Sequence, residues 1–124
     1  MTPRIVLTLA AALLFVAVGT GAFGAHALRA RLAPDALAIW QTAVQYHFWH
    51  GLGLLGTGIL LLQRPESGAL VWAAVLFVAG IVLFSGSLYA LALTDAKALA
   101  IVTPFGGVAF LCAWAALGWA AWRW

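Results

Sequence analysis

Three histidines are the side chains of this sequence most able to do chemistry. His47 and His50 are three residues apart, so they share one face if the segment is a helix. That spacing suits two ligands of a metal or a haem, but a catalytic zinc needs about three protein ligands, and only His26 is left to add. The one carboxylate near them in the chain is Asp35. We therefore predict no catalytic residues, no metal site and no cofactor.

A glycine-rich segment from Gly19 to Gly24 matches the dinucleotide-binding pattern GxGxxG. That pattern binds a dinucleotide only between a strand and a helix, with an acidic residue about 20 positions later. Here it ends a long apolar run, and Asp35 follows too early. We interpret the segment as a glycine-rich helix end.

The composition identifies the class of protein. Hydrophobic residues make up 66% of the 124 and charged residues only 7%, whereas a soluble domain has about 25% charged residues. Four long stretches lack any Lys, Arg, Asp or Glu, and each can supply the roughly 20 apolar residues of a membrane crossing. Because backbone groups must be paired within lipid, such stretches cross as helices. A water-exposed fold is excluded.

We therefore predict an all-α integral membrane protein that forms a single domain over residues 1–124. The predicted fold is an antiparallel four-helix transmembrane bundle with spans over about 5–23, 42–63, 69–93 and 99–122. Between the first two spans lies an interfacial segment over about 28–41. Apolar residues recur there at i, i+3 and i+4 after Pro34, which predicts an interfacial amphipathic helix that starts near Asp35 and bends or tilts into the second span. The alternative for the first span is a cleavable signal peptide, but its uncharged run is longer than a usual signal core.

The positively charged residues are isolated at the ends of the spans and form no basic face, so we predict no nucleic-acid partner. Cations in this position bind lipid headgroups, so the predicted partner is the lipid bilayer. Three cations fall on each side of the membrane, so the positive-inside rule does not fix the orientation. The two sets are Arg4, Arg64 and Arg123, and Arg29, Arg31 and Lys97.

Antiparallel spans bring four unusual segments into one leaflet: Gly19–His26, Gln45–His50, Phe84–Tyr89 and Thr103–Gly107. One interpretation is a polar pocket, because ionisable groups at membrane depth are costly and usually functional. Its lining would be His26, His47, His50, Ser85, Ser87, Tyr89 and Thr103. The other interpretation is a structural seam, in which small residues let helices approach and hydroxyls bond across for about 0.6 kcal/mol each. The helix-packing residues would then be Gly21, Gly24, Gly86, Gly106 and Gly107.

Thr103 and Pro104 leave two alternatives for the fourth span. Proline inside a helix removes a hydrogen bond and kinks the chain. Alternatively the helix begins at Thr103 as its cap, with Pro104 as its first residue and residues 98–102 as a separate short piece.

These four segments also carry a resemblance. The pieces GAFGAH at 21–26, FSGSLY at 84–89 and TPFGG at 103–107, together with the stretch from Gln41 to His50, resemble the YgdD-like family of small bacterial inner-membrane proteins. This is a family of unknown function with small animal transmembrane relatives. The resemblance implies a multi-pass protein of the plasma membrane (the bacterial inner membrane) with no established activity. His47 stands where the family would have glutamine, so His50 is the stronger candidate, and the end at Arg123 and Trp124 lacks the basic tail of some relatives.

From these observations we expect a non-enzymatic structural or accessory protein that forms a homo-oligomer or joins a larger membrane complex. The alternative is a module that binds or transports a small molecule, lipid or ion. Its candidate ligand residues are His26, His50, Ser85, Ser87, Tyr89 and Thr103.

Overall fold

The computed structural model describes all of residues 1–124 and contains only helices and turns. Its elements are α1 (Pro3–Phe23), η1 (Gly24–Leu28), α2 (Pro34–Gln63), α3 (Gly68–Gly80), η2 (Ile81–Gly86), α4 (Ser87–Thr94), η3 (Lys97–Ile101) and α5 (Thr103–Trp122). The segments η1 and η2 are π-helical, and η3 is a 3₁₀ helix. The predicted all-α class is confirmed.

Successive elements join into four long helical rods: α1 with η1, α2 alone, α3 through α4, and η3 with α5. Three of the rods, Pro3–Leu28, Gly68–Thr94 and Lys97–Trp122, are long and apolar enough to cross a membrane. The rod formed by α2 is not among the three. It carries more polar side chains than the others, among them His47 and His50.

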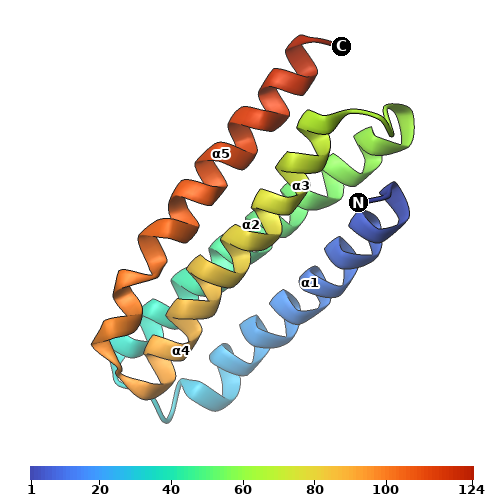
Figure 1. The fold of residues 1–124 in the computed structure, drawn as a ribbon. Coiled ribbons are helices and arrows are strands. Elements are labelled where there is room, and N and C mark those ends of the chain that lie inside the picture. The colour runs from blue at the N-terminus through green and yellow to red at the C-terminus, as the bar shows by residue number, and fades with distance from the viewer.

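The rods form a layered arrangement with α1 and α5 on opposite sides (Figure 1). The helix α2 packs against α1, α3 and α4, while α5 packs mainly on α3 and η2. Both chain termini lie towards the same end of the molecule. The interior is formed by Val6 of α1, Leu54 and Leu61 of α2, and Leu70 and Phe77 of α3, all completely buried.

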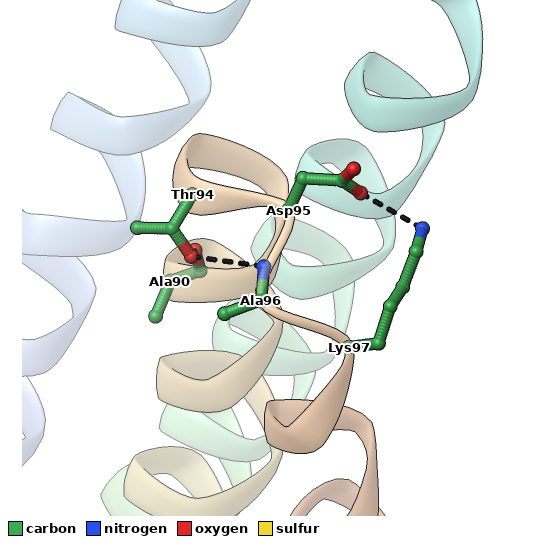
Figure 2. Close-up of polar contacts among 5 residues, drawn as sticks. All are labelled: Ala90, Thr94, Asp95, Ala96 and Lys97. Carbon is green, nitrogen blue, oxygen red and sulfur yellow. Dashed lines mark hydrogen bonds and ion pairs between the residues drawn. The ribbon is translucent and has the colours of Figure 1, made fainter.

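The connection between the third and fourth rods is a tight turn (Figure 2). Asp95 adopts a left-handed conformation (φ 55°), and Lys97 Nζ donates to its carboxylate at 2.8 Å. The Ala96 amide donates to the hydroxyl of Thr94 at 3.3 Å. Both charged side chains are exposed, which fits a polar turn at the membrane surface.

The helix expected to start near Asp35 and to continue into the second span is a single element. The helix α2 runs without a break for 30 residues from Pro34 to Gln63. Pro34 opens the helix, and no proline or turn follows that would end it near residue 41. Residues 29–33 form the connection between the first two rods.

The structure also decides between the two alternatives for the fourth rod. The 3₁₀ helix ends at Ile101 and α5 begins at Thr103, with Pro104 in its first turn, so the proline opens a helix and does not kink one. The residue that precedes the helix is Val102, and the Thr103 side chain does not act as a cap. Its hydroxyl instead contacts the hydroxyl of Ser87.

Candidate functional site

A chain of hydrogen bonds centred on Tyr89 links three of the rods. The Tyr89 hydroxyl lies 2.9 Å from Nδ1 of His47 on α2 and 3.0 Å from the hydroxyl of Thr20 on α1. The carbonyl of Thr20 accepts from Nε1 of Trp40 at 2.9 Å. The aromatic rings of Trp40 and Tyr89 are also in contact, with centroids 4.6 Å apart. These four side chains hold α1, α2 and α4 together just before η1 and just after η2.

Two further contacts involve the serines of the third rod. The buried Ser85 hydroxyl donates to the carbonyl of Ala43 on α2 at 2.8 Å. The hydroxyls of Ser87 and Thr103 lie 2.6 Å apart and join α4 to the start of α5. Ser87 also bonds to the carbonyl of Phe84 at 2.9 Å, inside its own rod. Each of these hydroxyls therefore has a partner within the protein.

His50 lies in a box of aromatic rings. Its ring stacks on Phe110 of α5, with centroids 3.5 Å apart and an interplanar angle of 11°. Phe77 and Trp114 approach it from α3 and α5, each with a centroid distance of 6.0 Å. The ring atom Nδ1 lies 2.7 Å from the carbonyl oxygen of Tyr46. Because a carbonyl only accepts, Nδ1 carries the proton in the neutral ring.

The three histidines differ in their surroundings. His26, in η1, is exposed and makes no hydrogen bond, so it takes no part in the contacts described above. His47 is only 2% exposed, and its Nε2 is the single buried side-chain nitrogen or oxygen without a hydrogen-bond partner. The order of the spans predicts that His47 and Tyr89 lie in one leaflet, and they are in contact, although the resemblance ranks His47 below His50. Thr20 and Trp40 were not predicted as members of the network at all.

Two of the five predicted packing glycines stand where a side chain would not fit. A Cβ atom at Gly106 would overlap the backbone of Phe84 in η2, so α5 and η2 touch through their main chains. A Cβ at Gly24 would lie 2.5 Å from Nε1 of Trp40. A Cβ at Gly21 would lie 3.3 Å from a methyl carbon of Val44, which is a tight contact but a milder one. Gly86 and Gly107 have more room, with the nearest atoms at 3.9 Å.

Four cavities are present, and none is lined by His47, His50, Ser85, Tyr89 or Thr103, although one touches the network at Trp40. The nearest, of about 230 Å³, lies between Gly21, Gly24 and Ala25 on one side and Trp40 and Gln45 on the other. No group of three or more His, Cys, Asp or Glu side chains is placed to hold a metal ion.

Comparisons with known proteins agree on one group. The sequence model of a family described as "protein of unknown function (DUF423)" matches residues 20–107, a range that includes all four polar segments apart from Gly19 at the start of the first. The chain is 48% identical over 99 residues to the UPF0382 membrane protein YwdK of Bacillus subtilis, which covers 80% of each chain. No solved structure matches it.

A second relative extends the similarity over most of the chain. It is the UPF0382 inner membrane protein YgdD of Escherichia coli, 44% identical over 115 residues, with 93% of this chain and 87% of the relative covered. These names describe membrane proteins and state no activity.

Proposed function

The chain belongs to the DUF423 family of membrane proteins, and on that premise we propose that it is a non-enzymatic membrane protein that crosses the bilayer four times and associates with copies of itself. It is a multi-pass protein of the membrane, with three rods that are apolar enough to span. The fourth crossing and the association with a second copy are what we propose in addition.

The length and position of α2 support a fourth crossing. Its 30 residues give a helix about 45 Å long, against a hydrocarbon core of about 30 Å. Its polar side chains His47 and His50 are buried against neighbouring rods, while Leu52, Ile59 and Leu62 point outward. From His47 to Leu62 the helix buries its polar side chains and exposes apolar ones, which suits lipid, while Gln41 and Gln45 are exposed nearer its start.

The observation that carries the proposed association is a shallow apolar depression on the outer face of α1, which we call the α1 cavity. It has a volume of about 450 Å³ and is lined by Ala11, Leu14, Phe15, Val18 and Gly19. A Cβ atom built at Gly19 would meet no atom within 4 Å. Phe15, one turn earlier on the same face, is 81% exposed. Helices in membranes associate where small residues let a neighbour come close.

These features favour a symmetric pair of α1 helices. In a two-fold arrangement the same patch serves both copies, so Phe15 of each copy would enter the other's cavity beside Gly19. The inner polar side chains favour the same kind of function, since their hydroxyls are bonded to one another or to the backbone. The inner polar side chains are therefore occupied, and the outward-facing surfaces of the helices remain available to contact a second copy.

Gly19→Leu tests this association, with Gly118→Leu on α5 as the matched control. Both glycines have open space at the Cβ position, so neither change should disturb the single chain. Gly19→Leu should fill the α1 cavity and convert the protein from a dimer to a monomer in light scattering and in cross-linking within native membranes. Gly118→Leu should leave the dimer intact. A wild-type protein that is monomeric in both settings contradicts the proposal.

A second candidate, a binding module for a small polar molecule, is favoured by His47 alone. Its buried Nε2 makes no hydrogen bond of good geometry and has only the Leu13 backbone within reach, and a poorly paired buried nitrogen costs up to about 1–3 kcal/mol unless a ligand or water bonds to it. A small molecule retained by the purified protein and lost on His47→Leu, but not on His26→Leu, would support this function. Retention unaffected by His47→Leu would exclude that site.

A further inference from the structure

A second cavity, at the end of the molecule that holds both termini, has the features of an anion site. It has a volume of about 360 Å³ and lies between the α2–α3 turn and the last turns of α5. Its lining includes Arg64, Ser67 and Ala69 from the turn, and Trp119, Arg123 and Trp124 from the end of the chain. Neither arginine has a salt-bridge partner, because the only ion pair in the structure joins Lys97 to Asp95 at the opposite end.

Both guanidinium groups are held over indole rings. Arg64 lies over the ring of Trp124, 4.9 Å from its centroid, and Arg123 lies over Trp119 at 5.3 Å. Such cation–π contacts hold an arginine in place while they leave its N–H donors free. The two positive side chains are therefore positioned at the cavity without being neutralised.

The start of α3 adds backbone donors to the same cavity. Ser67 caps this helix, its side chain accepting from the amide of Leu70 at 3.4 Å. The amides of Gly68 and Ala69 in the first turn donate to no acceptor in the protein. Free amides at a helix start favour an anion, and Ala69 of this turn lines the cavity that also holds two arginines.

We propose that this cavity binds the phosphodiester group of an anionic phospholipid. The guanidinium groups would donate to the phosphate oxygens, with the α3 amides and the Ser67 hydroxyl as further donors. Glu66, which also lines the cavity, is exposed and pairs with neither arginine, so it opposes the anion and lowers the affinity.

The surroundings favour a lipid over a soluble phosphate. Tryptophan is enriched at the depth of the headgroups, and this end of α5 carries Trp119, Trp122 and Trp124. Trp119 is 56% exposed, so an acyl chain below the headgroup can lie along it. A soluble phosphate would gain nothing from these apolar neighbours.

The test is native mass spectrometry of the full-length protein released from nanodiscs that contain phosphatidylglycerol and phosphatidylethanolamine. We expect retained phosphatidylglycerol in preference to phosphatidylethanolamine. Arg64→Gln and Arg123→Gln should each lower its apparent affinity by about tenfold, since each removes charge-assisted hydrogen bonds. Arg4→Gln is the control, because Arg4 is at the same end, carries the same charge and does not line the cavity. Glu66→Gln should raise the affinity.

Three results would overturn the proposal. Equal losses on Arg4→Gln and Arg64→Gln would show a general attraction of positive charge for the membrane. Equal retention of the two lipids would remove the preference for an anionic headgroup. Thermal stabilisation in lipid-free detergent by inorganic phosphate, as large as that by phosphatidylglycerol, would identify a soluble anion as the ligand. Unchanged helicity by circular dichroism excludes misfolding, and a gain on Glu66→Gln cannot arise from it.

Discussion

The Tyr89 hydroxyl lies 2.9 Å from Nδ1 of His47, and this contact joins α4 to α2 in the interior of the protein. The same hydroxyl also meets Thr20 on α1 at 3.0 Å. One phenol oxygen therefore serves three rods, and the stability of the arrangement should depend on it.

Tyr89→Phe should destabilise the protein by about 1–3 kcal/mol, because it leaves the hydroxyl of Thr20 and Nδ1 of His47 without their shared partner. Unfolding in mixed micelles at increasing SDS measures the effect. Tyr46→Phe is the matched control, since the Tyr46 hydroxyl makes no hydrogen bond within the protein and its ring stays in place. Equal effects of the two changes would show that the Tyr89 hydroxyl adds nothing.

The geometry predicts the tautomer of His50. Nδ1 faces the carbonyl oxygen of Tyr46 at 2.7 Å, so nitrogen-15 NMR of the neutral ring should show the proton on Nδ1. The exposed ring of His26 has no such partner and should show a mixture of both tautomers. A proton on Nε2 of His50 would contradict the described contact.

The contact between Ser87 and Thr103 predicts a measurable coupling. Their hydroxyls are 2.6 Å apart, and in a double-mutant cycle Ser87→Ala with Thr103→Val should give a coupling energy of about 0.6 kcal/mol, within a ceiling of about 1.7 kcal/mol. The pair Ser87→Ala with Thr20→Val provides the comparison, because these two residues share no hydrogen bond. Strictly additive effects for the first pair would rule out a stabilising bond between the rods.

Gly106→Ala should destabilise the protein by about 1–3 kcal/mol, since the new methyl group overlaps the backbone of Phe84 and must push α5 away from η2. Gly118→Ala lies on the same helix, where nothing stands within 4 Å, and should leave stability unchanged or raise it by up to about 1 kcal/mol. The SDS unfolding midpoint measures both. A stable Gly106→Ala variant would show that the close approach is not required.

Much of this arrangement could be predicted from the order of apolar and polar segments. Uncharged stretches interrupted by short polar turns leave few options other than helical rods that run up and down. That order alone implied that Ser87 and Thr103 would come near each other, and they do. The contact between Tyr89 and Thr20 follows from the same order, although Thr20 was not singled out.

Other features depend on contacts that no local pattern reveals. The π-helical segments, η1 in the first rod and η2 in the third, carry no residue pattern that predicts a wide turn. His47 was ranked low on a resemblance, because its burial and its contact with Tyr89 arise from three rods together. Pro34 was correctly placed at a helix start. The same reasoning left Pro104 open, since proline is tolerated both in kinks and in first turns.

The wide turn of η2 has a consequence for how the third rod could be altered. Successive residues of an α-helix are rotated by about 100° around the axis, so one residue gained or lost turns everything beyond it by that angle. A π-helical turn holds about one residue more than an α-helical turn, so removing one residue between Ile81 and Gly86 would let the segment close into a regular helix with Ser87 and Tyr89 still on the same side. The third rod can therefore absorb the loss of one residue at η2, whereas the same loss within α3 or α4 would rotate every residue beyond it.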